Sequence, residues 1–121
     1  MTAPLARKVP RRLLRVLRER MADEPVIVLH GLRSVGKSTL LRDLAGEVAA
    51  TVVDLDEPAV RQAVSADPML YATAPAPVLI DEFQHVPSVL DAIKAELNRD
   101  LRAGRYVLTG STSYTTLPRA A

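Results

Sequence analysis

The sequence predicts an α/β fold: a three-layer sandwich in which helices cover both faces of a mainly parallel sheet. Four short apolar runs alternate with segments whose apolar residues recur at helical spacing, as in chains built from successive strand–helix units. The runs are continuously apolar, which is typical of strands buried on both faces of a parallel sheet. A length of 121 residues with 48% hydrophobic content suits one domain with a core and argues against wholesale disorder.

The expected elements follow one another without an internal repeat. Pro10 suits the first turn of a helix, and Pro25 immediately precedes the first apolar run. In chain order we expect a helix over 10–21, a strand over 26–29, a loop over 31–36 that leads into a helix, a strand over 51–55, helices that start near Pro58 and Pro68, a strand over 78–80 that ends at Asp81, a helix from Ser88, and a strand over 106–108.

Local signals place the ends and the inner faces of these helices. Asp56 and Asp67 are each expected to cap a helix with proline in its first turn. Ser88 and Asp91 approximate a capping box, and Gly104 is expected to end the last helix. The side chains expected to face the core are Leu40, Leu41, Leu44 and Val48 in the second helix and Leu90, Ile93, Leu97 and Leu101 in the last.

The charge is unevenly distributed. Residues 1–20 carry seven basic side chains and one acid, whereas the remainder has a net charge of −4. A basic arm on an acidic body is typical of proteins that bind nucleic acids or other anionic partners. Leucines opposite Arg11, Arg15 and Arg18 also fit a surface helix docked by its apolar side, and this interpretation is favoured over contact with nucleic acid or membrane.

Other classes of protein are excluded or disfavoured by what the sequence lacks. With no cysteine there is no disulfide scaffold, and with only His30 and His85 a zinc site would need carboxylates. No apolar stretch approaches the roughly 20 residues of a membrane helix, and the N-terminus lacks the apolar region of a secretory signal. We therefore expect a cytoplasmic protein without a membrane partner.

The segment 31–38, GLRSVGKS, fits the phosphate-loop pattern G-x-x-x-x-G-K-[ST]. Glycines let the backbone curl so that its N–H groups surround a polyphosphate, and the helix that follows adds its positive dipole end. An apolar run before the loop and an amphipathic segment after it favour this interpretation over an incidental glycine turn. The expected nucleotide-binding residues are Gly31, Arg33, Ser34, Val35, Gly36, Lys37, Ser38 and Thr39, with Lys37 at the β- and γ-phosphates, Ser38 on Mg²⁺ and Thr39 at the α-phosphate.

Two acids end the third apolar run. Ligands gather at the carboxyl ends of parallel strands, so Asp81 is expected beside the phosphate loop, where it would hold Mg²⁺ through water. Glu82 is expected to orient or deprotonate an attacking water, although two solvated acids entering a loop remain the alternative. Thr109 and Ser111 could contact the γ-phosphate or the water, or could be simple turn residues, and Gln84 is a weaker candidate for the same water.

These motifs together resemble the AAA+-type "ATP-binding protein" family of bacteria and archaea, over nearly the whole chain. By that resemblance Lys37, Ser38 and Thr39 match Walker A, Asp81 and Glu82 match Walker B, and 109–111 matches the sensor-1 region. Family members continue with a fifth core strand, a helical lid, an arginine finger and a further domain. The resemblance therefore implies an N-terminal ATPase part, truncated after about four strands, whose strand 26–29 lies at an exposed edge. That edge could support self-association or pairing with another chain.

The sequence thus predicts a single incomplete domain over 1–121, with a basic helix over 1–22, a nucleotide-binding core over 23–111 and an irregular tail over 112–121. The leading hypothesis is an ATP-binding, Mg²⁺-dependent module with weak or absent hydrolysis of its own. ATP is preferred to GTP because no [NT]-K-x-D motif is present. A small-molecule kinase, or a non-catalytic remnant that binds nucleic acid or a partner through the basic helix, are the alternatives.

Overall fold

A parallel sheet organises the computed structural model, which describes the backbone of residues 3–30 and 34–110 and the side chains of residues 11–30 and 36–110. Within these residues, four strands pair in the order β1-β4-β3-β2, and every pairing is parallel. The elements are α1 (Ala3–Met21), β1 (Val26–Leu29), α2 (Ser34–Val48), β2 (Val52–Asp54), α3 (Pro58–Ala66), α4 (Pro68–Ala72), β3 (Val78–Asp81), the 3-10 turn η1 (Phe83–His85), α5 (Ser88–Arg99) and β4 (Tyr106–Thr109).

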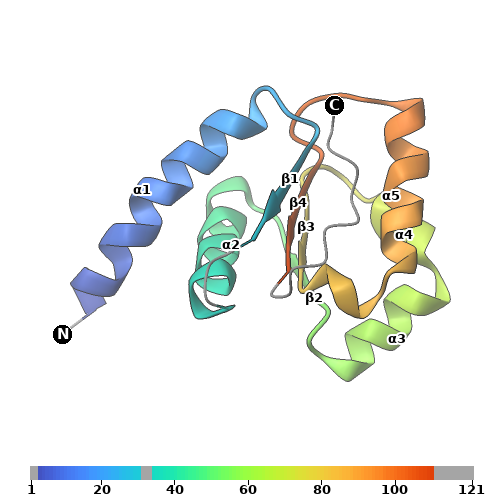
Figure 1. Ribbon diagram of the computed structural model, residues 1–121, viewed down its shortest axis with the longest axis horizontal. Helices are drawn as coiled ribbons and strands as arrows, with labels where there is room; N and C mark the ends of the chain where they lie inside the picture. The colour runs from blue at the N-terminus through green and yellow to red at the C-terminus, as the bar shows by residue number, and fades with distance from the viewer. Residues whose placement is uncertain (1–2, 31–33, 111–121) are drawn as a thin grey trace.

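Helices cover both faces of this sheet. Helices α1 and α2 lie on one face, and α3, α4 and α5 lie on the other (Figure 1). The predicted α/β class, with three layers and a parallel sheet, is therefore confirmed. Strand β1 lies at one edge of the described sheet, and its four residues are only partly buried, whereas all of β3 and β4 is buried.

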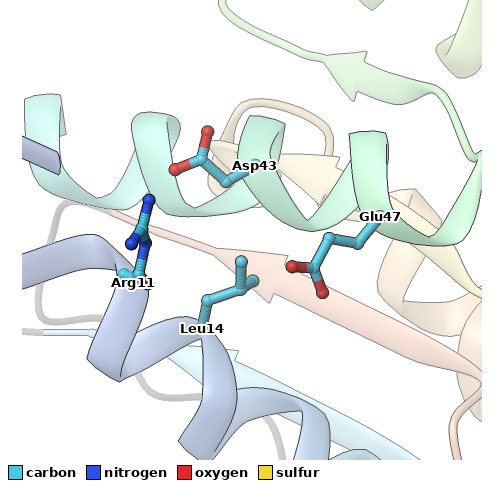
Figure 2. Close-up of a pocket in the computed structure, with 4 residues that line it drawn as sticks. All are labelled: Arg11, Leu14, Asp43 and Glu47. Atoms are coloured by element: carbon cyan, nitrogen blue, oxygen red, sulfur yellow. The ribbon is translucent and has the colours of Figure 1, made fainter. Parts of the chain in front are cut away.

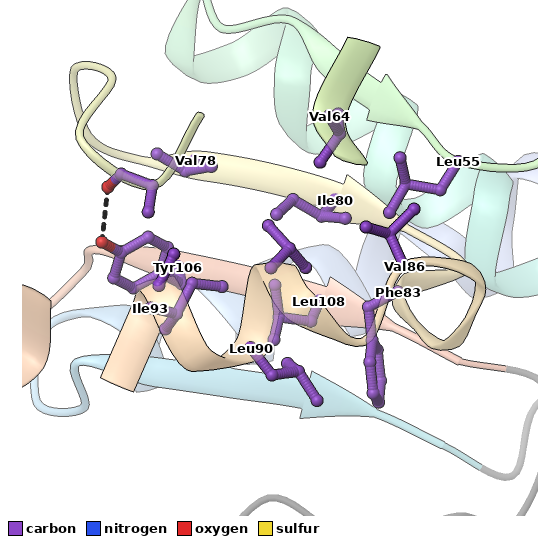
Figure 3. Packing of buried hydrophobic residues seen from close by; sticks show 13 residues of the cluster. Leu55, Val64, Val78, Ile80, Phe83, Val86, Leu90, Ile93, Tyr106 and Leu108 are labelled. Atoms are coloured by element: carbon purple, nitrogen blue, oxygen red, sulfur yellow. Dashed lines mark hydrogen bonds between the residues drawn. The ribbon is translucent and has the colours of Figure 1, made fainter. Parts of the chain in front are cut away.

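The face covered by α3, α4 and α5 holds the larger apolar cluster (Figure 3). Tyr106 lies at one end of the drawn cluster, near Ile93, with 1% of its surface exposed, and its hydroxyl donates a 2.6 Å hydrogen bond to the Ala72 carbonyl. Burial raises the pKa of the Tyr106 phenol. A buried phenol with a backbone acceptor fixes α4 against the start of β4.

The opposite face is built mainly from leucines. Leu14 and Leu17 of α1 pack with the buried leucines of α2, as expected for a helix docked by its apolar side. Arg11, Arg15 and Arg18 remain exposed. A groove of about 210 Å³ lies between the two helices and is lined by Arg11, Leu14, Asp43 and Glu47 (Figure 2). No helix in the described part of the chain is both long enough and apolar enough to cross a membrane.

Three predicted helix starts differ from the structure. Helix α1 begins at Ala3 and not near Pro10, which lies in the helix interior although proline removes a helical hydrogen bond there. The N-cap of α3 is Glu57 and not Asp56, and no side chain caps that helix. Ser88 is already helical, so the predicted capping box does not form, because Pro87 occupies the N-cap position.

The other differences lie at the C-terminal end of α5, which stops at Arg99. Gly104 adopts a φ of +74° in the turn before β4 and does not end the helix. Leu101 consequently lies outside the helix, 68% exposed, and not on its inner face. The predicted cap at Asp67 is confirmed, because its side chain accepts a hydrogen bond from the Leu70 amide.

Candidate functional site

Parallel pairing brings the carboxyl ends of the strands to one edge of the sheet. Leu29 at the end of β1 pairs with Thr109 at the end of β4, and Asp54 at the end of β2 pairs with Asp81 at the end of β3. Helix α2 starts five residues after β1 ends, so its first turns lie at the same edge. The chemistry-bearing side chains of three elements are thereby gathered at one place.

Lys37, in the first turn of α2, is fully buried. Its Nζ donates a hydrogen bond to the carbonyl of Gly110, the residue that follows β4. Burial of an ammonium group is costly unless acceptors surround it, and this carbonyl is one such acceptor. The contact directs the positive charge toward the carboxyl edge of the sheet and away from bulk water.

Asp81 is 4% exposed, and its carboxylate accepts hydrogen bonds from two hydroxyl groups. Ser38 Oγ donates to its Oδ2 over 2.9 Å, and Thr109 Oγ1 donates to its Oδ1. Hydroxyl and carboxylate oxygens are the hard ligands that suit Mg²⁺, which commonly takes one or two carboxylates and completes its shell with water and phosphate. In the described residues no group of three or more His, Cys, Asp or Glu side chains is placed to hold a metal. The donor set therefore fits Mg²⁺ that is shared with phosphates, and it does not fit an all-protein metal cage.

The Thr109 side chain connects the ends of β3 and β4 by hydrogen bonds. Its fully buried hydroxyl accepts a 3.0 Å hydrogen bond from the Glu82 amide while donating to Asp81. One side chain from β4 therefore fixes both the carboxylate at the end of β3 and the backbone of the next residue. The sequence pointed to Thr109 for contact with phosphate or water, whereas in the structure it holds the two acids in place.

Glu82 leaves the strand in a left-handed conformation, with φ 61° and ψ 54°. This region is uncommon for residues other than glycine and marks a position that its surroundings hold in place. The side chain is 7% exposed, and its Oε1 accepts a 2.7 Å hydrogen bond from Gln84 Nε2. The residue that follows Asp81 in the chain is thus a second buried acid, whose carboxylate is held by Gln84.

Gly110 is a part of the site for which the sequence analysis found no role. A Cβ at this position would lie 2.9 Å from Cε2 of Phe83 and 3.2 Å from Oε1 of Gln84, closer than side chains normally approach. Its amide also donates to the Leu29 carbonyl over 3.3 Å. The sequence could have pointed to Gly110 only through its position between Thr109 and Ser111, and an ordinary turn would explain a glycine there equally well.

The remaining candidates divide into three groups. Gly36 is exposed and Thr39 half-buried in α2. His30 packs edge-to-face on Phe83, with ring centroids 6.4 Å apart, and His85 Nε2 lies 3.3 Å from Asp56 Oδ1. Gly31, Arg33 and Ser111 lie outside the described residues, and only the backbone of Ser34 and Val35 is described.

Two relatives of known sequence are similar to this chain. The chain is 31% identical over 98 residues to an uncharacterized protein of Mycobacterium bovis and, equally, to one of Mycobacterium tuberculosis. The match covers 80% of this chain and 22% of each relative, so the chain spans about a fifth of the length of the curated relatives it matches. No solved structure matches.

The family assignment rests on a match to a family model. The model of the family described as "AAA domain" matches residues 23–121, from just before β1 through β4 and beyond. The match includes the phosphate-loop motif and both strand-end acids. Together with the parallel sheet and the site at its carboxyl edge, this match shows that the chain belongs to the AAA domain family of P-loop ATPases and is an AAA-type nucleotide-binding module.

Proposed function

We propose that this protein binds ATP together with Mg²⁺ at the carboxyl edge of its sheet and that, on its own, it hydrolyses ATP slowly or not at all. The observation that carries the proposal is the convergence of a buried lysine and a hydroxyl–carboxylate pair at that edge. Lys37 is fully buried there, and Ser38 contacts Asp81 over 2.9 Å. P-loop enzymes use this combination of groups on a phosphate chain and its metal.

In this proposal each polar side chain has one task. Lys37 contacts the β- and γ-phosphates, and Ser38 and Asp81 hold Mg²⁺ directly or through water. Bound Mg²⁺ would neutralise charge on the phosphate oxygens. Glu82 orients or deprotonates the attacking water, and Thr109 keeps the two carboxylates in place.

The loop residues complete the proposed nucleotide site through their backbone. Amides of 31–36 would donate to the phosphates, which a helix N-terminus also attracts. Thr39 and Ser111 are assigned contacts with the α-phosphate and the γ-phosphate by the motif alone. Slow turnover of the isolated protein is proposed because an arginine finger, which contributes about 10³–10⁵ to turnover in related P-loop enzymes, is in some of them supplied by a second protein.

Calorimetric titration with ATP and with a non-hydrolysable analogue, each with and without Mg²⁺, tests the proposal. Lys37→Ala should abolish measurable binding of both ligands. Lys94→Ala is the matched control, because Lys94 is an exposed lysine on α5, on the opposite face of the sheet. Equal binding by wild type and Lys37→Ala would refute the proposed site. Glu82→Gln should retain binding and lose whatever hydrolysis the wild type has.

We also propose that the outer edge of β1, which has no partner strand among the described residues, pairs with another strand, in a second copy of the chain or in a different chain. Support comes from the position of β1 at the edge of the described sheet. The carbonyls of Pro25 and Leu29 accept hydrogen bonds from the β4 side, so the alternate residues Val26 and Val28 direct their backbone groups outward. Sedimentation over a range of concentrations should show self-association that Val28→Pro weakens. A monomer at every concentration would refute pairing between copies.

A further inference from the structure

A side-chain hydrogen bond joins two residues of the turn that follows β3. Gln84 Nε2 donates to Glu82 Oε1 over 2.7 Å, one of the shorter hydrogen bonds in the described part of the chain. The intervening Phe83 is 3% exposed and anchors the turn in the apolar cluster. Figure 3 shows Phe83 at the end of that cluster, beside Val86 and Leu108. The amide and the carboxylate are therefore held together on a turn whose central residue cannot readily move.

The backbone of the same turn is fixed at both ends. Thr109 Oγ1 accepts from the Glu82 amide, and the Glu82 carbonyl accepts from the His85 amide over 3.2 Å. The left-handed conformation of Glu82 is thus imposed by contacts on either side of it. With the backbone held in this way, the remaining freedom of Glu82 is in its side-chain torsions, and the Gln84 amide restricts those.

Gly110 leaves room for the glutamine. A Cβ there would lie 3.2 Å from Gln84 Oε1 and still closer to the Phe83 ring, so any side chain at this position would push the turn outward. The carbonyl of the same glycine accepts from Lys37 Nζ. One residue with no side chain therefore leaves space beside the glutamine that holds Glu82 and accepts a hydrogen bond from the lysine of the phosphate loop.

We propose that Gln84 is a positioning residue for Glu82: its amide fixes the orientation of the carboxylate on which water activation depends. The sequence alone pointed to contact between Gln84 and the water itself, whereas the 2.7 Å contact makes Glu82 the group through which Gln84 acts. The catalytic consequence rests on the proposed ATPase function. The positioning contact itself is a property of the nucleotide-free protein and can be measured there.

The chain is well suited to this measurement because it contains only two glutamines, Gln62 and Gln84, and one asparagine, Asn98. In a ¹⁵N correlation spectrum of the nucleotide-free protein, the side-chain amide of Gln84 should be shifted from that of exposed Gln62 and should exchange more slowly with solvent. Glu82→Ala should move the Gln84 signals toward those of Gln62 and leave Gln62 unchanged. Glu82→Gly is the second variant, because glycine adopts a φ of 61° without strain and keeps the turn even if alanine unfolds it. Coincident Gln84 and Gln62 signals in the wild type, or Gln84 signals that neither variant moves, would overturn the proposal.

Kinetics provide the second readout. Gln84→Met keeps the length of the side chain and removes its donor, and it should lower kcat on the order of 10- to 100-fold while leaving KM and the calorimetric Kd for ATP within about twofold. Turnover is measured under single-turnover conditions with enzyme in excess. In a Glu82→Asp background, which keeps a carboxylate but draws it back from the Gln84 amide, the same substitution should have less than about a twofold further effect, since Gln84 acts through that contact. Gln62→Met on α3 should change nothing. Equal effects of Gln84→Met in both backgrounds would show that Gln84 acts independently of Glu82 and would overturn the inference. If Lys37→Ala does not weaken ATP binding, the proposed ATP site is refuted, but the spectroscopic result on Gln84 and Glu82 still stands.

Discussion

Replacing Thr109 by valine keeps the shape of the side chain and removes a single hydroxyl that serves two partners. The hydroxyl is fully buried, accepts from the Glu82 amide over 3.0 Å and donates to the Asp81 carboxylate. A neutral hydrogen bond contributes about 0.5–1.5 kcal/mol and one to a charged group about 1.5–3 kcal/mol. Because the Glu82 amide and Asp81 Oδ1 are buried and would each lose this partner, Thr109→Val should lower the free energy of unfolding by about 2–4 kcal/mol.

Thr109→Ser is the matched control, since it retains the hydroxyl and loses one buried methyl group, at a cost of about 1 kcal/mol. Urea unfolding followed by circular dichroism would give both free energies. For a domain of this size each kcal/mol corresponds to roughly 3–6 °C in Tm, so valine should lower Tm on the order of 10 °C. If valine costs no more than serine, the hydroxyl does not connect the ends of β3 and β4, and the account of how the two acids are held is wrong.

Three further predictions concern parts of the fold outside the site. Burial raises the pKa of the Tyr106 phenol, so the folded protein keeps this proton above about pH 10, where an unfolded tyrosine loses it. The unfolded state then binds fewer protons than the folded state, so the free energy of unfolding falls as the pH rises. Tyr106→Phe should make this fall smaller in urea unfolding measured between about pH 9 and 11. An unchanged pH dependence of the free energy of unfolding would contradict the prediction. The same variant should cost about 1–3 kcal/mol at neutral pH, because the buried Ala72 carbonyl loses its 2.6 Å partner. Asp67→Ala should cost about 1 kcal/mol in the same assay by removing the acceptor of the Leu70 amide, and a neutral result would mean that α4 does not depend on this cap. Arg18→Ala should lower the free energy of unfolding by at most about 1 kcal/mol, and by less in high salt, since both side chains of the ion pair with Glu47 are about half exposed. A larger or salt-independent cost would contradict this and indicate packing by the apolar part of the Arg18 side chain.

The positions of the strands along the chain and their parallel pairing could be predicted, because the apolar runs and the helical segments between them indicate the same type of fold. Continuous apolar runs such as Val26–Leu29 and Val78–Ile80 indicate strands in a parallel sheet, and intervening segments of helical periodicity supply the crossovers. Helix ends were predicted less well, since a capping residue is defined by backbone geometry that several neighbouring residues could supply. Ser88 illustrates the point: its sequence context fits a capping box, but Pro87 already holds the N-cap position.

The residue types at the site could also be predicted, because a phosphate loop after a strand and an acid at the end of another strand imply each other in a parallel sheet. The contacts among them could not. That Thr109 serves two residues and that Gly110 must lack a side chain both depend on how closely the ends of β3 and β4 approach. The hydrogen bond from Gln84 to Glu82 depends on the left-handed turn at Glu82. Hydropathy and spacing carry no information on that approach.

The uneven charge of the sequence has a partial explanation in the pairing of α1 with α2. Arg18 NH1 lies 2.5 Å from Glu47 Oε1, and Arg11 lines the groove that contains Asp43 and Glu47 (Figure 2). These arginines of the basic helix therefore face acids of the next helix, across a contact whose centre is the packing of leucines. Ion pairs this exposed contribute little stability, so the apolar side holds α1 in place and the arginines lower the repulsion among the acids of α2. A polyanion that bound this side of the helix would have to displace Glu47 from Arg18, and the positive charge it met would be smaller than the sequence of residues 1–20 alone suggests.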